Sequence, residues 1–122
     1  MTGITLPVDR VLDVGCGTGQ SSVALVGNAR RVLGIDSSAY MLSVRRRHPA
    51  VTYCQAAAEK LPVSERAVDL VVVALAFHWL RQEPFLAEAH RVLRPTGWLI
   101  VYDAWFTGHM NDHAEFSQWF RT

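Results

Sequence analysis

A cluster of glycines follows an acidic residue near the start of the chain, in the order Asp13, Gly15, Cys16, Gly17 and Gly19. Glycine permits positive φ angles and lets the backbone approach a ligand closely. The cluster ends a β-rich run and opens a helical stretch, whose first N–H groups have no partner within the helix. These features predict a ligand site at this turn. A tight glycine turn without a ligand is the alternative.

A second acidic residue, Asp36, ends the next β-rich run. A carboxylate at this place in an α/β fold can accept hydrogen bonds from both hydroxyls of a ribose. The glycine spacing is G-x-G-x-G, whereas dinucleotide-binding turns have G-x-G-x-x-G, and position 20 here is Gln. No Gly-Lys-Ser/Thr follows, which argues against a Walker loop. We therefore expect a ligand with a ribose and no pyrophosphate, and we disfavour a nicotinamide-dependent oxidoreductase.

β-rich runs alternate with helical stretches along the chain. The runs are Arg10–Val14, Arg31–Ile35, Val51–Gln55, Val68–Ala74 and Trp98–Tyr102. The helical stretches are Gln20–Val26, Ser38–Arg47 with Ser37 as its N-cap, and Pro84–Leu93, while Ala56–Ala67 indicates a short helix or a loop. Continuously apolar strands are buried on both faces, as in a parallel sheet covered by helices. The pattern predicts an α/β fold with a doubly wound, mainly parallel sheet.

The chain resembles the class I S-adenosylmethionine-dependent methyltransferases from about Val8 to Asp103. Within that family it is similar to the small-molecule branch, which includes trans-aconitate and ubiquinone/menaquinone methyltransferases. The resemblance rests on the segments VLDVGCGTGQ, GIDSSAYML, AAAEKLP, VDLVVVALAFHW and RVLRPTGWL. It implies a Rossmann-like sheet with strand order 3-2-1-4-5, S-adenosylmethionine as cofactor, and transfer of its methyl group to a small-molecule acceptor.

The resemblance also implies roles for the residues of the glycine cluster. Gly15, Gly17 and Gly19 would lie against the methionine part of the cofactor, with Cys16 as a small residue beneath it. Asp13 would reach the amino group of the cofactor, directly or through water. Asp36 would hold the ribose hydroxyls.

Further positions would surround the adenine and the sulfonium. Ser37 and Met41 would flank the adenine, and Ala58 and Glu59 would lie at its edge. Ala57 stands where many relatives have an acid that accepts from the adenine amino group. Ala74 and Ala76, which follow the fourth strand, would line the sulfonium side. His78 could orient the acceptor or take a proton from it; a histidine that begins a helix and packs with Trp79 is the alternative.

Compared with that family, the chain resembles a partial domain. We expect one domain over residues 1–122, with an aromatic-rich tail at 104–122, five strands, and the family's last two strands missing. The fifth strand would then have a bare edge, which proteins normally cover. Phe116, Trp119 and Phe120 fall on one helical face of the tail. We expect a homodimer through this edge and the tail; a tail folded over its own sheet is the alternative.

Composition and charge narrow the classes of function. Hydrophobic residues make up 50% of the chain and charged residues 19%, which is typical of a globular domain. A net charge of +1 offers no basic surface for phosphate backbones, so we expect no nucleic-acid partner. The longest apolar run, Leu70–Phe77, is too short to span a bilayer, and the start of the chain has no signal pattern. We therefore expect no membrane partner. Two cysteines are too few for a disulfide scaffold, so we expect a cytoplasmic protein.

Two alternatives to this reading remain. His109, Asp112 and His113 could form a metal site, but the neighbouring Gly108 and Asn111 favour a solvated loop, so we expect no metal. A truncated, non-catalytic module that binds the cofactor or packs as a subunit is the alternative to an active enzyme.

Overall fold

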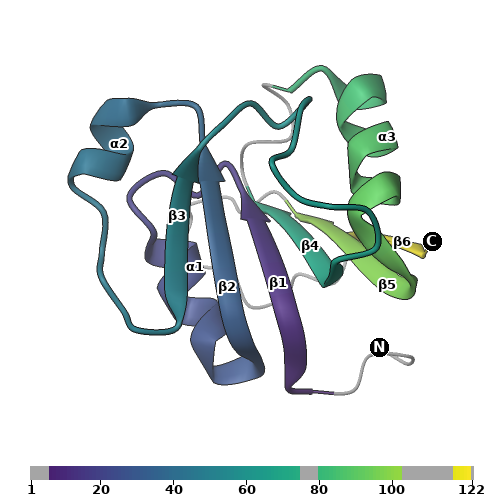
Figure 1. Ribbon diagram of the computed structural model, residues 1–122, viewed down its shortest axis with the longest axis horizontal. Coiled ribbons are helices and arrows are strands. Elements are labelled where there is room, and N and C mark those ends of the chain that lie inside the picture. Colours follow the sequence, from purple (N-terminus) through teal and green to yellow (C-terminus); the bar gives the residue numbers. More distant parts are fainter. Residues whose placement is uncertain (1–5, 75–79, 103–116, 122) are drawn as a thin grey trace.

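The computed structural model describes residues 6–74, 80–102 and 117–121. These residues form one six-stranded sheet with flanking helices (Figure 1). The strands are β1 (Val8–Val14), β2 (Ala29–Asp36), β3 (Val51–Gln55), β4 (Val68–Ala74), β5 (Leu93–Tyr102) and β6 (Ser117–Arg121). The helices are α1 (Gln20–Ala24), the 3-10 turn η1 (Leu25–Asn28), α2 (Ala39–Ser43) and α3 (Gln82–Val92). No helix within these ranges has the length and apolar character that crossing a bilayer requires.

The first five strands confirm the predicted order. They run β3-β2-β1-β4-β5, and every neighbouring pair among them is parallel. The chain winds outward from β1 to β3 and then returns to the other side of β1 with β4. Ligands of doubly wound sheets bind at this switch point, outside the carboxyl ends of the strands. The glycine cluster follows β1 directly, so the fold places it at that point.

The prediction of a bare fifth strand is wrong. β6 pairs antiparallel with β5, from Trp98 opposite Arg121 to Tyr102 opposite Ser117. A strand rather than a helix therefore covers this edge, so Trp119 and Phe120 do not belong to a helix. Phe116 lies outside the described residues. The homodimer remains a prediction, but an unpaired β5 edge no longer supports it.

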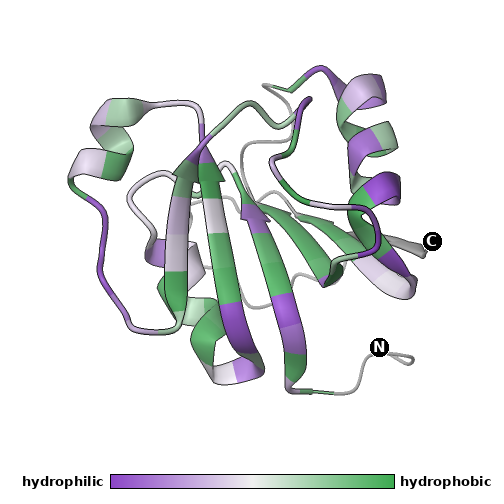
Figure 2. Cartoon of the chain, viewed as in Figure 1, coloured by the Kyte–Doolittle hydropathy of each residue, from purple (hydrophilic) through white to green (hydrophobic). Residues whose placement is uncertain are grey.

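Two hydrophobic clusters lie on opposite faces of the sheet, because successive residues of a strand point to opposite sides. Leu12 and Val14 of β1 join the cluster that packs against α3, whereas Val11 joins the cluster that packs against η1. Phe85 and Val92 of α3 are fully buried in the first cluster. Figure 2 shows that β4 is mainly apolar, whereas β1 has hydrophilic residues among its apolar ones. Burial on both faces holds the carboxyl ends of these strands in place.

Helix α2 is shorter than predicted, and its N-cap is Ser38 rather than Ser37. The Ser38 Oγ accepts a hydrogen bond from the Met41 N–H at 3.2 Å. The helix ends at Ser43, and the Arg45 guanidinium donates to the Leu42 carbonyl at 2.8 Å. The Arg46 N–H then donates to the carbonyl of Thr18 in the glycine turn, also at 2.8 Å. This hydrogen bond joins residues far apart in the sequence and directs the chain after α2 away from the helix axis.

Most other boundaries lie close to the predicted ones, but β5 begins at Leu93 rather than at the predicted Trp98. β3 and β4 have the predicted bounds, and segment 56–67 is a loop. The predicted helix after the glycine turn divides into α1 and η1. β5 begins at Leu93, directly after α3, because Leu93 already pairs with Val68. The register then shifts before Trp98 pairs with Leu70, which makes residues 94–97 an irregularity within the strand rather than a separate turn.

Candidate cofactor site

Three glycines of the turn after β1 adopt left-handed backbone conformations. Their φ angles are 72° at Gly15, 58° at Gly17 and 87° at Gly19. Residues with a Cβ rarely adopt such angles. A Cβ on Gly19 would collide with the ring and hydroxyl of Tyr53, whereas a Cβ on Gly17 would meet nothing within 4 Å. Gly19 is therefore needed for packing, and Gly17 borders open space.

Four backbone N–H groups of this turn are hydrogen-bonded within the protein. Those of Gly15 and Cys16 both donate to the Ile35 carbonyl, at 2.7 and 2.9 Å. The Gly17 N–H donates to the Asp36 Oδ2 at 2.8 Å, and the Gly19 N–H donates to the Cys16 carbonyl at 2.9 Å. A phosphate-binding turn aims such groups at its ligand. These four N–H groups therefore point at acceptors within the protein, and the absence of a pyrophosphate from the ligand stays a prediction.

Asp36 connects the turn to the start of α2. Its Oδ2 accepts from Gly17 and its Oδ1 accepts from the Ser38 N–H, also at 2.8 Å. An ionised carboxylate offers about four lone-pair positions. Each oxygen can therefore accept a further hydrogen bond, so the two backbone contacts orient Asp36 and leave acceptor capacity for a ligand.

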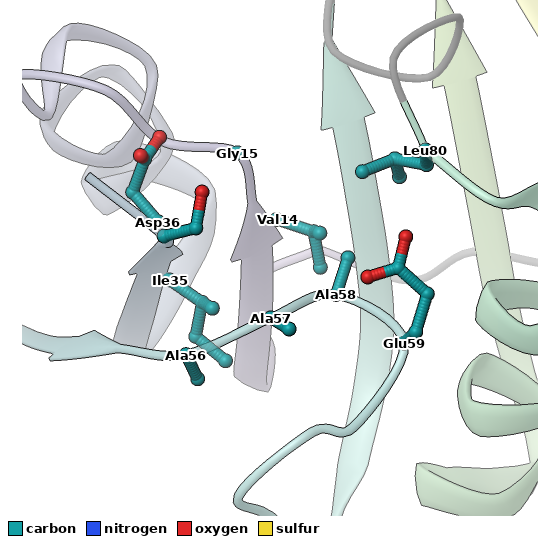
Figure 3. A pocket seen from close by; sticks show the side chains of 10 residues that line it. Val14, Gly15, Ile35, Asp36, Ala56, Ala57, Ala58, Glu59 and Leu80 are labelled. Carbon is teal, nitrogen blue, oxygen red and sulfur yellow. The ribbon is translucent and has the colours of Figure 1, made fainter.

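A cavity of about 290 Å³ opens beside Asp36, at the lower end of the size range of ligand pockets. Figure 3 shows Gly15 and Asp36 on one side of it and Ala57, Ala58 and Glu59 on another. Its lining comprises Val14, Gly15, Ile35, Asp36, Ser37, Ala56, Ala57, Ala58, Glu59 and Leu80. Two of these side chains are carboxylates and none is basic, which favours a neutral or cationic ligand over an anionic one.

Asp13 is buried beneath the turn, with 1% of its surface exposed. Its Oδ2 accepts hydrogen bonds from the hydroxyls of Ser21 and Ser22, at 2.6 and 2.7 Å. Among the described residues, its Oδ1 has no hydrogen-bond partner. Burial raises the pKa of Asp13, the two serine hydroxyls lower it, and the charge of Asp36 raises it further. A buried carboxylate with a free acceptor oxygen is suited to a donor that a ligand brings.

Cys16 supports the turn and is not suited to nucleophilic attack. Burial, followed by the charges of Asp13 and Asp36, raises the pKa of the thiol to about 12. The thiolate is the reactive form, so the thiol is inert near neutral pH. A Cβ on Gly34 would meet the Cys16 Sγ at 3.1 Å and the Ser22 Oγ at 2.8 Å. The packing behind the turn is therefore close.

The structure brings together most of the residues predicted for the adenosine side of the site. Asp36, Ser37, Ala57, Ala58 and Glu59 all line the cavity.

Other predicted positions lie apart from the cavity or outside the description. Met41 is 41% exposed on α2 and is not part of the cavity lining. Ala74 ends β4, and only its backbone is described. Ala76 and His78 lie outside the described residues, as do His109, Asp112 and His113. Within the described part of the chain, no three His, Cys, Asp or Glu side chains converge as metal ligands would.

Several site residues were not predicted from the sequence. Leu80 and Ala56 line the cavity, Ser21 and Ser22 hold Asp13, and Tyr53 packs against Gly19. Of these residues, only the two serines give a local sequence signal, because two hydroxyls in the first turn after a glycine cluster indicate a buried acceptor. Leu80 and Tyr53 reach the site only through tertiary contacts.

A comparison with protein families decides the class of this protein. The family described as "methyltransferase domain" matches residues 12–101. The chain belongs to this methyltransferase family. The matched range includes Asp13, Asp36 and the whole cavity lining. The buried carboxylate, the glycine turn and the cavity are therefore parts of a methyltransferase domain.

Curated methyltransferases resemble this domain over part of their length. An uncharacterized methyltransferase of Mycobacterium tuberculosis is 40% identical over 89 residues, which make up 72% of this chain and 37% of the relative. The malonyl-[acyl-carrier protein] O-methyltransferase of Pectobacterium atrosepticum is 39% identical over 90 residues, or 72% of this chain and 36% of the relative. The chain thus spans little more than a third of the length of these relatives.

Solved structures confirm the methyltransferase fold. A proposed type II methyltransferase from Anaeromyxobacter dehalogenans matches with a TM-score of 0.79 at 34% identity, over 85% of this chain and 45% of that one. An S-adenosylmethionine-dependent methyltransferase from Mesorhizobium loti matches with a TM-score of 0.73 at 26% identity, over 84% of this chain and 50% of that one.

The raised pKa of Asp13 predicts a pH-dependent effect of Asp13→Asn on the ligand-free protein. Because the pKa is higher in the folded chain, Asp13 stabilises the fold most below its unfolded pKa of about 3.9. This contribution is lost as the pH rises through the folded-state value. Asparagine does not titrate. The free energy of unfolding of the variant minus that of the parent should therefore increase as the pH rises above about 4.

Urea denaturation at a series of pH values measures this difference. Asp9→Asn is the control, because the Asp9 side chain is 48% exposed. If the difference in the free energy of unfolding between Asp13→Asn and the parent stays constant with pH, the expected effect of burial is contradicted.

Proposed function

We propose that this chain is the S-adenosylmethionine-binding core of a methyltransferase that acts on a small-molecule acceptor. Membership of the methyltransferase family and the likeness to an S-adenosylmethionine-dependent enzyme support the cofactor. One relative is named as a malonyl-[acyl-carrier protein] O-methyltransferase. That relative supports methyl transfer, while the small size of the acceptor rests on the resemblance of the sequence motifs.

The observation that carries the proposal is the pair of carboxylates, Asp13 and Asp36, at the glycine turn. S-adenosylmethionine bears an ammonium, a sulfonium and a ribose, and it has no phosphate. The unpartnered Oδ1 of Asp13 is suited to the ammonium, and the remaining acceptor positions of Asp36 are suited to the ribose hydroxyls. The open space at Gly17 allows a ligand to approach the turn closely. The residues present therefore fit this cofactor.

The proposed reaction depends on positioning by the residues of the chain. The bound cofactor supplies an electrophilic methyl group on its sulfonium. Asp13 and Asp36 would orient the cofactor, while Ala57, Ala58 and Leu80 would exclude water from its adenosine part. Holding two reactants in line supplies a large part of the rate in such displacements.

The acceptor side of the proposed site begins where β4 ends. Ala74 is the last residue of β4, at the carboxyl edge of the sheet where ligands of this fold bind. Ala76 on the sulfonium side, and His78 as a residue that positions the acceptor, remain predictions.

The alternative is a module that binds the cofactor without catalysis. The chain's coverage of little more than a third of its curated relatives favours this alternative, because the remaining parts could supply the acceptor pocket. Incubation with methyl-labelled S-adenosylmethionine and pools of small carboxylic acids, amines and quinols separates the two functions. We expect a labelled product together with S-adenosylhomocysteine. Binding of the cofactor without turnover on any pool would favour the non-catalytic module.

A further inference from the structure

Glu59 connects the wall of the cavity to the start of helix α3. Its Oε2 accepts a hydrogen bond from the backbone N–H of Arg81 at 2.9 Å. Figure 3 shows the Glu59 carboxylate directed toward the chain at Leu80. Both Glu59 and Leu80 line the cavity. One residue therefore lines the cavity and also contacts the start of α3.

This hydrogen bond gives the start of α3 an acceptor that comes from outside the helix. Arg81 is the N-cap residue of α3, and its own side chain makes no capping hydrogen bond. The first N–H groups of a helix have no partner within it, and the helix dipole favours negative charge at this end. Glu59 supplies both an acceptor and a charge from a loop 22 residues earlier in the chain.

The same loop is fixed to α3 at a second place. The Leu61 N–H donates to the Glu88 Oε1 at 2.7 Å, and the Arg91 guanidinium donates to the Leu61 and Val63 carbonyls at 3.0 and 2.8 Å. Arg91 and Glu88 also form an ion pair at 2.7 Å. These hydrogen bonds fix the loop to α3 at Leu61 and Val63, which are not part of the cavity lining. The contact of Glu59 thus joins a residue of the cavity lining to the start of α3 by a hydrogen bond.

We propose that Glu59 is a positioning residue that couples occupation of the cofactor cavity to the position of the first turn of α3. This inference rests on the proposed function, which supplies the ligand. A ligand against the wall formed by Ala57, Ala58 and Glu59 restricts its motion and favours the hydrogen bond between Glu59 and Arg81. Because coupling between two equilibria is reciprocal, that hydrogen bond also raises the affinity for the ligand.

The test follows amide hydrogen exchange at Arg81 by NMR, with and without S-adenosylhomocysteine, together with calorimetry of the same ligand. The variants are Glu59→Ala, which removes the acceptor, and Glu59→Gln, which keeps an acceptor oxygen. Glu83→Gln is the matched control, because Glu83 lies in the first turn of α3, is exposed, and is not part of the cavity lining.

In the parent, S-adenosylhomocysteine should slow exchange at Arg81 by roughly fivefold or more. Glu59→Ala should abolish this slowing and raise the Kd about tenfold, the effect of losing one hydrogen bond. Glu59→Gln should retain most of the slowing, and Glu83→Gln should behave as the parent. A purely structural Glu59 would lower the melting temperature of Glu59→Ala and leave the ligand-dependent slowing intact.

Two further outcomes separate this inference from the proposed function. Binding of S-adenosylhomocysteine to the parent without any change at Arg81 would overturn the inference alone. Equal losses of affinity in Glu59→Ala and Glu83→Gln would also overturn it, because they would indicate a general effect of charge. No binding of the ligand to the parent would overturn the proposed function, and the inference with it.

Discussion

Replacement of Gly19 by alanine is expected to lower the free energy of unfolding by about 2–5 kcal/mol. One part of this cost is the left-handed backbone at φ 87°, which costs a residue with a Cβ about 1–2 kcal/mol. The other part is the collision of the new Cβ with Tyr53, an overpacking of about 1–3 kcal/mol. Tyr53 cannot turn away freely, because its hydroxyl donates to the Arg46 carbonyl at 2.6 Å. A small domain has only about 5–15 kcal/mol in total.

Gly17→Ala is the matched control for this prediction. Gly17 has a similar backbone conformation, at φ 58°, but its Cβ would meet nothing within 4 Å. Only the backbone cost of about 1–2 kcal/mol is expected for it. Chemical denaturation of the two variants measures both values. Equal losses of stability would show that Tyr53 does not restrict Gly19.

Asp36→Ala is expected to lower the affinity for S-adenosylmethionine by about 1.5–3 kcal/mol, the range for hydrogen bonds to a charged group. From the sequence alone, Asp36 faces the ligand and little change in stability is expected. The structure adds the two backbone N–H groups, of Gly17 and Ser38, that Asp36 accepts from. The variant should therefore lose stability as well, because both donors lose their acceptor.

Asp69→Ala separates these two effects. Asp69 also accepts one backbone hydrogen bond, from the Arg10 N–H at 2.9 Å, and it pairs with Arg94 at 2.6 Å. It does not line the cavity. We expect Asp69→Ala to lose stability and to keep its affinity, as measured by calorimetry below the melting temperature. An affinity of Asp36→Ala equal to that of the parent would place the ribose elsewhere.

The sequence predicted the parallel part of the sheet well, because its signals are local. β3 and β4 are short β-rich runs with clear ends, and the predicted bounds agree with the observed ones. The length of α2 was overestimated, since the hydrogen bond between Arg46 and Thr18 joins segments far apart in sequence. β6 could not be predicted, because an antiparallel pairing across a long connection has no local signature.

The candidate site shows the same division between local and tertiary signals. Asp13 and Asp36 end or nearly end their strands, so their positions followed from the strand pattern. Glu59 was predicted at the edge of the adenine, and the structure adds its contact with Arg81, which depends on where α3 begins. The contribution of Leu80 to the cavity depends on the same placement.

Calorimetric titration of the ligand-free chain with S-adenosylmethionine, S-adenosylhomocysteine and nicotinamide adenine dinucleotide tests the central claim most directly. The carboxylates at the turn, and the backbone N–H groups already bonded within it, predict that the first two ligands bind and that the phosphate-bearing dinucleotide does not. Asp36→Ala, measured in parallel, should weaken both binding ligands. No binding of either at about 1 mM, the limit of weak affinity near 4 kcal/mol, would contradict the account. Tighter binding of the dinucleotide would contradict it as well.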